Sequence, residues 1–143
     1  KNFWNKIKGE NILIFQTDTC LCSKNKHKIY DFLKYDYVGA PWKKFKNIGG
    51  NGGLSFRKKS KMIEMIKFYP NYIKKKSFPH TNEDVFFSSM KLNFPSKVDA
   101  SNFSVEQVYN KNPFGIHKPW NNLSKKELNS LQNSCIELQK IFK

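Results

Sequence analysis

The sequence is poor in arginine and in acidic residues. Arg57 is the only arginine among 26 basic residues, and 11 aspartates and glutamates leave a net charge of +15. Proteins that read base sequence depend on the bidentate fork of arginine, so this composition argues against such a reader. Abundant lysine, asparagine, isoleucine and phenylalanine indicate an AT-rich genome, which favours a solvated lysine surface. An anionic partner stays open as the alternative.

Cysteine is also scarce, and long apolar runs are missing. Cys20, Cys22 and Cys135 are an odd set without metal-binding spacing, so we expect reduced thiols and a cytoplasmic location. No stretch reaches the ~18 apolar residues of a membrane span, and no signal peptide opens the sequence. The expectation is a protein without a membrane span in this chain.

What the sequence does contain is enough apolar material for one folded domain. It has 143 residues, of which 38% are hydrophobic and 15% aromatic. These values are typical of a packed core rather than of a disordered chain. We therefore predict a single domain over residues 1–143, with a C-terminal helix over 124–143.

Predicted strands and helices alternate along the chain, which favours the α/β class. Strands are expected at 12–15, 37–38, 52–58 and 101–107. Helices are expected at 27–35, at 59–69 up to Pro70, and at 81–92 with Thr81 or Asn82 as N-cap. In the last helix Ser124 and Glu127 form a capping box, followed by an apolar stripe at Leu128, Leu131, Cys135, Leu138 and Phe142.

A single carboxylate follows the first strand, in the stretch "NILIFQTDT". Polar groups at the carboxyl end of a buried strand lie where open α/β sheets bind ligands. Asp18 is therefore either the closing residue of an Asx turn or an oxygen ligand for Mg²⁺ or Mn²⁺. The residue by itself does not decide between the two.

Four glycines occur within five positions, Gly49 to Gly53, directly before a predicted strand. One interpretation is an ordinary flexible hairpin loop. The other is a wall of bare backbone against which a sugar ring can lie. A phosphate-binding loop is excluded, because the GxxxxGK[ST] pattern is absent and a strand follows instead of a helix.

Two further segments carry ionisable side chains in suggestive settings. Glu83 and Asp84 begin a predicted helix, where they either complement the helix dipole or include a general base. His117 lies in "NPFGIHKPW", stiffened by two prolines, and is either a packed histidine or a metal ligand. Lys118 beside it is suited to a phosphate group.

The order of these segments resembles a little-characterised family of glycosyltransferase-like domains and, more loosely, nucleotide-sugar transferases of the GT-A type. The motifs that carry the resemblance are "FQTD", "YDYVGAPW", "GNGGLSFR", "EDVFF", "FSVE" and "PFGIHKPW", between about Phe3 and Trp120. The resemblance implies a GT-A-like, Rossmann-like fold with a mixed sheet flanked by helices. Only 11 residues precede Ile12, so either the chain is part of a longer protein or most of the nucleotide-binding half is missing.

The resemblance also implies roles for individual residues. Asp18 and His117 would bind a divalent cation, Mn²⁺ or Mg²⁺, with Gln16 where these enzymes have the first aspartate of an Asp-x-Asp element. Gly52 and Gly53 would face the sugars. Of the two carboxylates, Asp84 would be the catalytic base and Glu83 would orient the acceptor.

Two tryptophans each follow a rigid turn, Trp42 after "VGAP" and Trp120 after "HKP". They either flank the sugar, because aromatic faces pack on pyranose rings, or simply belong to the core. With Lys118 they complete the expected substrate-binding set.

The function expected from this resemblance is a metal-assisted, inverting glycosyltransferase. It would transfer a sugar from a nucleotide-diphosphate donor to a carbohydrate or other hydroxyl acceptor. Two alternatives remain from other classes. One is a lysine-rich nucleic-acid-binding module with aromatic stacking platforms, which the shortage of arginine disfavours. The other is a sugar-binding pseudoenzyme that does not turn over.

Overall fold

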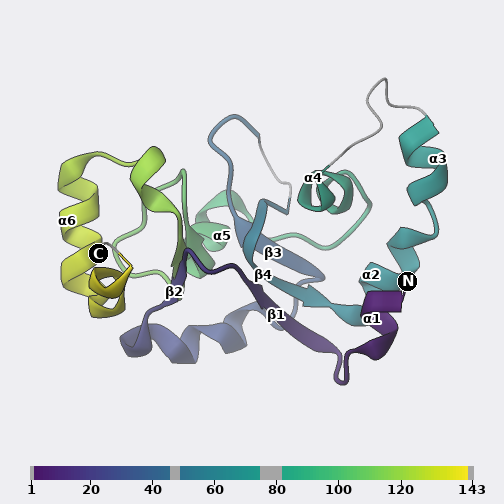
Figure 1. Cartoon of the computed structure of the whole chain (residues 1–143), viewed down its shortest axis with the longest axis horizontal. Coiled ribbons are helices and arrows are strands. Elements are labelled where there is room, and N and C mark those ends of the chain that lie inside the picture. Colours follow the sequence, from purple (N-terminus) through teal and green to yellow (C-terminus); the bar gives the residue numbers. More distant parts are fainter. Residues whose placement is uncertain (1, 46–48, 75–81, 142–143) are drawn as a thin grey trace.

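The computed structural model describes residues 2–45, 49–74 and 82–141. Within them the chain is a mixed α/β protein, with two small sheets flanked by helices (Figure 1). This confirms the predicted α/β class. Helices α1 (Asn2–Lys6) and α2 (Lys59–Ile66) lie at one end of the molecule, and α6 (Lys125–Ser134) lies at the other.

The first sheet is antiparallel throughout, with the strand order β1-β4-β3. Its strands are β1 (Asn11–Phe15), β4 (Asn51–Lys58) and β3 (Tyr37–Ala40), which confirms three of the predicted strands. The pairing of β3 with β4 shifts register between Gly39 and Ala40. A Cβ on Gly39 would lie 2.3 Å from the Asn51 carbonyl oxygen, so glycine permits this close approach.

The second sheet has the order β2-β6-β5 and is mixed, because β2 is antiparallel and β5 parallel to the central β6. Its strands are short: β2 (Thr19–Leu21), β6 (Gly115–His117) and β5 (Ser104–Val105). We predicted a strand over 101–107, but α5 (Lys97–Phe103) occupies the first part of that range. The Ser96 side chain accepts a hydrogen bond from the Asp99 amide and so caps α5, a signal that the alternating pattern concealed.

Two predicted helices also differ from the structure. The helix predicted over 59–69 is α2 followed by a separate α3 (Tyr69–Lys74), in which Pro70 is the second residue. Proline is tolerated in a first helical turn, so Pro70 begins a helix here instead of ending one. The helix predicted at 27–35 is a 3₁₀-helix, η1 (Ser23–Phe32).

The helix predicted over 81–92 is shorter than expected, because α4 spans Glu83–Ser88. Asn82 occupies the N-cap position without a side-chain capping bond. The other N-cap candidate, Thr81, lies outside the described residues.

The C-terminal segment confirms the predicted capping box but not the single predicted helix. Ser124 and Glu127 make both reciprocal hydrogen bonds at the start of α6. The helix ends before Cys135, whose ψ of 88° is not helical, and η3 (Ile136–Lys140) follows as a 3₁₀-helix. Leu131, Cys135 and Leu138 of the predicted stripe are buried, and Phe142 lies outside the described residues.

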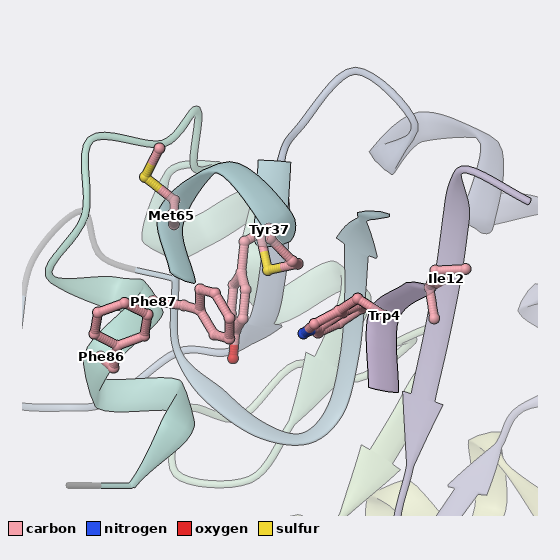
Figure 2. Close-up of a cluster of buried hydrophobic side chains, with 7 residues drawn as sticks. Trp4, Ile12, Tyr37, Met65, Phe86 and Phe87 are labelled. Carbon is pink, nitrogen blue, oxygen red and sulfur yellow. The ribbon is translucent and has the colours of Figure 1, made fainter. Parts of the chain in front are cut away.

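Three hydrophobic clusters hold these layers together. One lies between the first sheet and α1, α2 and α4, where the Phe87 ring packs beside Tyr37 at 6.4 Å between centroids (Figure 2). A second covers the other face of that sheet with η1 and α5, through Phe32 and Phe103. The third joins the second sheet to α6 and η3. Each sheet therefore acquires its own helical cover.

The cysteines correct one expectation. Cys22 and Cys135 form a disulfide, so the prediction of three reduced thiols is wrong for this pair. Cys20 is the free, buried cysteine, and burial followed by the nearby Glu137 charge raises the pKa of its thiol to about 12. Disulfides are typical of oxidising compartments. The cysteines therefore no longer support the cytoplasmic location, which stays a prediction. Among the described helices, none is long and apolar enough to cross a membrane.

Candidate functional site

The two sheets meet where β1 turns into β2, and this turn brings two of the predicted site residues together. The Gln16 amide donates to the Gly53 carbonyl at 2.8 Å, which continues the β1–β4 ladder by one residue. Thr19 then pairs with His117 across β2 and β6. As a result the Asp18 Oδ1 and His117 Nε2 atoms are 3.2 Å apart, although they are far apart in the sequence.

His117 is buried, and each of its ring nitrogens faces a polar side chain. Nε2 lies 3.2 Å from Gln16 Oε1 as well as from Asp18 Oδ1. Nδ1 lies 3.7 Å from Oε2 of Glu106, a buried carboxylate. Gly53 makes room for the ring, because a Cβ there would lie 2.2 Å from the His117 Cε1 and Nε2 atoms.

This arrangement has the dimensions of a cation site. Two ligand atoms held ~2.1 Å from one ion at a right angle lie about 3.0 Å apart, close to the observed separation. Within the described part of the chain, Asp18 Oδ1 is buried and has no hydrogen-bond partner. The Glu106 carboxylate lies behind the ring, but at 3.7 Å its Oε2 atom is too far from Nδ1 for the hydrogen bond that outer partners of metal-bound histidines accept. The donor atoms thus fit a divalent ion.

The site would, however, offer an ion few protein ligands. Across residues 2–45, 49–74 and 82–141, no group of three or more His, Cys, Asp or Glu side chains is arranged to hold a metal. Asp18, His117 and the neutral Gln16 oxygen would have to be completed by ligands from elsewhere. A cation held this way is typical of Mg²⁺ sites that share their ion with a substrate phosphate.

A polar cavity of about 320 Å³ adjoins this cluster. Its lining residues are Gln16, Asn51, Gly52, Gly53, Asn82, Glu83 and Asp84. The two glycines do contribute bare backbone to the wall, as expected. Their Cβ positions are nevertheless taken by side chains of the protein itself, since a Cβ on Gly52 would lie 2.7 Å from Glu83 Oε1. The two glycines therefore leave room for the side chains of Arg57, Glu83 and His117.

Asp84 is the most firmly held carboxylate of the cavity. Its Oδ2 accepts a hydrogen bond from the Gly52 amide at 3.2 Å, and its Oδ1 accepts one from the Val85 amide at 2.7 Å. The side chain is buried at the start of α4, where the helix dipole also favours a negative charge. Both oxygens keep a second lone pair, so the carboxylate can still accept a proton or a hydroxyl hydrogen bond.

Glu83 is mostly exposed and is anchored by the only arginine of the chain. Its Oε1 accepts from Arg57 Nη2 at 2.8 Å. Arg57 is 2% exposed, donates from Nε to Ser55, and lies over the Tyr37 ring at 4.8 Å. Burial lowers the pKa of Arg57, but electrostatic interactions with Tyr37, Glu83 and Asp84 and the hydrogen bond to Glu83 outweigh it, so the net shift is upward. The guanidinium stays charged beneath the cavity.

A second, more apolar cavity of about 520 Å³ adjoins the first. It is lined by Trp42, Phe45, Asn51, Tyr72, Asn82, Asp84, Val85, Ser88, Ser89 and Gln107. Trp42 meets the Phe45 ring edge-on at 5.9 Å. Asn51, Asn82 and Asp84 line both cavities, so the two form neighbouring compartments of one site.

Lys118 and Trp120 are set apart from these compartments, because neither contributes to the lining of the two cavities. Lys118 has a φ of 44°, a left-handed conformation that is costly for lysine, and its amide donates to the Asp18 carbonyl at 3.2 Å. Its exposed side chain therefore begins beside the Asp18–His117 pair. Trp120 is half-buried in η2 (Pro119–Asn121).

Sequence reasoning assigned no role to three residues of the site, Arg57, Glu106 and Asn51. A lone arginine in a lysine-rich chain and a carboxylate following an apolar strand were signals that could have been followed. Asn51 gave no such signal, because an asparagine between glycines is typical of any turn. Its Oδ1 accepts a local hydrogen bond from the Gly53 amide at 2.7 Å, but only the packing of β4 beside α4 places it in the lining of both cavities.

The comparisons with known proteins define the family of this chain but not its activity. Residues 1–117 match DUF5672, a family of proteins of unknown function. The match covers most of the chain, so the protein belongs to that family. Asp18, both glycines, the Glu83–Asp84 pair and His117 all lie within the matched range. Comparison with the curated proteins and with the solved structures gives no match.

Proposed function

We propose that this chain is the metal- and acceptor-side part of a GT-A-like glycosyltransferase. It would transfer a sugar from a nucleotide-diphosphate donor to a hydroxyl acceptor. The observation that carries the proposal is the Asp18–His117 pair, whose facing donor atoms are 3.2 Å apart beside a cavity that holds two further carboxylates. A metal site next to a candidate base is the combination that this reaction needs.

Asp18 and His117, with the Gln16 oxygen, would hold a Mn²⁺ or Mg²⁺ ion. The bound ion would neutralise the charge that develops on the departing diphosphate. Lys118 begins beside the pair and is suited to a phosphate oxygen. Glu106, whose Oε2 atom lies 3.7 Å from Nδ1, would place a negative charge on the side of the His117 ring opposite the ion.

The proposed step is an inverting displacement at the anomeric carbon. The acceptor oxygen forms a bond to that carbon while the bond to the diphosphate oxygen breaks, and the nucleoside diphosphate leaves with the electron pair. Asp84 takes the hydroxyl proton of the acceptor. We assign the base to Asp84 rather than Glu83, because Asp84 lines both cavities and Glu83 is already paired with Arg57.

The charge of the cavities favours this proposal over a nucleic-acid interface. Among the described residues, no lysine or arginine lines either cavity, whereas Asp84 lines both and Glu83 lines the polar one. Binding sites for single-stranded nucleic acid combine aromatic platforms with a basic groove. Here the aromatic side chains and the basic charge are separate.

A thermal-shift screen tests the donor and the metal together. The chain is heated with UDP-, GDP-, ADP- and dTDP-sugars, each with Mn²⁺ and with EDTA. Ligand that binds only the folded state raises its stability by mass action, so one donor class should raise the melting temperature only with Mn²⁺. Asp18→Asn and His117→Gln should abolish that shift, and Lys24→Gln, an exposed site away from both cavities, should keep it. Failure of every donor would reject the proposal.

The role of Asp84 is tested by turnover in the complete enzyme. Loss of a general base lowers the rate by ~10²–10⁴, so Asp84→Asn should retain donor binding and lose transfer by that factor. Glu83→Gln should lower the rate less. Near-normal transfer by Asp84→Asn would reject it as the base, and donor binding without turnover in the unaltered enzyme would identify a pseudoenzyme.

A further inference from the structure

We infer that the apolar cavity binds an uncharged carbohydrate chain, and that this chain is the acceptor. The second half of the inference rests on the proposed function; the first half, a binding site for neutral carbohydrate, does not. The proposal concerns the compartment of about 520 Å³ between Trp42, the start of α4 and Gln107. This size suits a sugar unit or two rather than a polymer groove.

Aromatic side chains form one part of the cavity wall. Trp42 and Phe45 contribute from the segment after β3, and Tyr72 contributes from α3. Such rings pack against the apolar C–H faces of pyranose sugars and bury large areas at low entropic cost. Trp42 is half-buried and belongs to none of the three core clusters, so core packing does not explain its position.

The polar part of the wall consists of neutral groups that can both donate and accept. Asn51, Asn82 and Gln107 supply amides, and Ser88 and Ser89 supply hydroxyls. Sugar hydroxyls likewise donate and accept, so these groups match them without needing a charge. Among the described lining residues only Asp84 is charged, and its negative charge disfavours phosphate and carboxylate ligands in a compartment without a cation.

Ser88 gives independent evidence for a polar ligand. It is 6% exposed, and its Oγ has no hydrogen-bond partner within the described part of the chain. A buried hydroxyl without a partner is costly in the free protein and calls for an explanation. A ligand hydroxyl in the cavity would provide the missing bond.

The shared lining explains how such a ligand would meet the donor. Asn51, Asn82 and Asp84 border both compartments, so a sugar in the apolar cavity ends at the Asp84 carboxylate. The polar compartment on the other side adjoins Gly53, which packs against His117. A terminal hydroxyl would therefore lie between the base and the metal-side compartment.

Binding is tested with the fluorescently labelled chain on a printed glycan array of neutral, sialylated and phosphorylated glycans, in EDTA and without nucleotide sugar. Neutral glycans should bind, and acidic ones should not. Binding to acidic glycans alone, or to no glycan, would overturn the inference. Because metal and donor are absent, this result is independent of the thermal-shift test: neutral binding without any donor shift would leave a carbohydrate-binding protein and reject only the transferase.

Variants then locate the binding site, measured by titration with the strongest neutral glycan. Trp42→Ala should weaken binding about tenfold, as expected for loss of one aromatic platform. Tyr30→Ala removes an aromatic ring that is 73% exposed on η1, and should leave binding unchanged. Equal effects of the two substitutions would place the sugar elsewhere and overturn the assignment.

Ser88→Ala separates a ligand role from a structural one. Removing a hydroxyl that has no partner should leave the melting temperature unchanged or raise it. If Ser88 serves the ligand, the same substitution should weaken glycan binding about three- to tenfold, the value of one neutral hydrogen bond. Unchanged affinity together with unchanged stability would contradict its assigned role.

Discussion

The two sheets are stabilised in different ways, and only one of them carries the cavities. The second sheet is joined to α6 and η3 by the Cys22–Cys135 disulfide and by an apolar cluster. The first sheet also packs between two apolar clusters, but its glycine-rich strand β4 in addition buries the charged side chain of Arg57. A disulfide and apolar packing raise the stability of the fold. Buried charged groups and glycines lower it, so their presence in a strand indicates a functional role. The candidate functional site therefore lies on the first sheet and at its border with the second.

At that border β4 of the first sheet packs against β6 of the second, and β3 packs against β5. Gly53 of the first sheet lies under His117 of the second, too close for any Cβ between them. The Asp18 turn crosses the same border. The packing of the second sheet therefore holds His117 in place against Gly53 of the first sheet.

The largest effect is expected from removing the cross-link of the second sheet. Cys22→Ala with Cys135→Ala should lower the free energy of unfolding by about 4 kcal/mol, because the disulfide closes a very long loop. Urea denaturation measures the loss. Cys20→Ala, in the same cluster but outside the disulfide, should cost about 1 kcal/mol. Equal losses would mean that the cross-link contributes nothing beyond packing.

Counting thiols checks the same pairing directly. In the folded protein Cys20 should resist iodoacetamide at pH 8, because it is buried and its pKa is about 12. Denaturant without reductant should expose one thiol, and denaturant with reductant three. Three thiols without reductant would contradict the disulfide.

The next largest effect should come from the buried arginine of the first sheet, and it should be asymmetric. Arg57→Ala should cost about 3 kcal/mol of stability, because it removes packing on Tyr37 and the bonds to Ser55 and Glu83. Glu83→Gln should cost no more than ~1 kcal/mol, because its side chain is 59% exposed and water replaces the partner. Chemical denaturation of both variants compares them. Equal costs would show that the ion pair itself, rather than burial of Arg57, carries the stability.

An intermediate effect is expected at the border between the sheets. Gly53→Ala places a Cβ 2.2 Å from the His117 ring, so the ring must move, at a cost of about 2 kcal/mol. Gly9→Ala meets no atom within 4 Å but has a φ of +89°, and should cost about 1 kcal/mol through backbone strain alone. Nuclear magnetic resonance of the His117 ring distinguishes them. An unperturbed His117 signal in Gly53→Ala would contradict the proposed contact.

The smallest effect is expected at the capping box of α6. Ser124→Ala should cost about 1 kcal/mol at pH 7. Hydrogen bonds from the Ser124 side chain and amide lower the pKa of Glu127, so this contribution is present above the unfolded-state pKa of glutamate and is lost as the pH falls through the folded-state value. The stability difference between variant and parent should therefore shrink towards pH 3. A constant difference would leave Glu127 outside the cap.

Local patterns were sufficient for much of the fold. The apolar run of β1 and the Ser124–Glu127 box were identified correctly, because neighbouring residues determine them, whereas Gly39 and Ala40, expected in a turn, belong to β3. The errors occurred where two local signals compete. Pro70 looked like a helix stop and is part of a helical first turn, and alternation at 101–107 concealed the Ser96 cap.

The site was predicted only in part for a similar reason. A resemblance of motifs selected Asp18 and His117, and the structure brings their side chains together. It could not show that Gly52 and Gly53 make room for Glu83 and His117, because such contacts join residues remote in sequence. The ion pair between Arg57 and Glu83 likewise could not be predicted from local sequence patterns.

The sequence by itself determined the α/β class, the capping of α6 and the candidate chemical groups, because composition and short-range periodicity encode them. Only the tertiary structure decided which of those groups face one another. It paired Cys22 with Cys135, buried the side chain of the single arginine, and placed Ser88 in the lining of a cavity. These outcomes depend on how separate helices and strands pack together. Such packing joins residues that are remote in sequence, so no short stretch of the sequence predicts it.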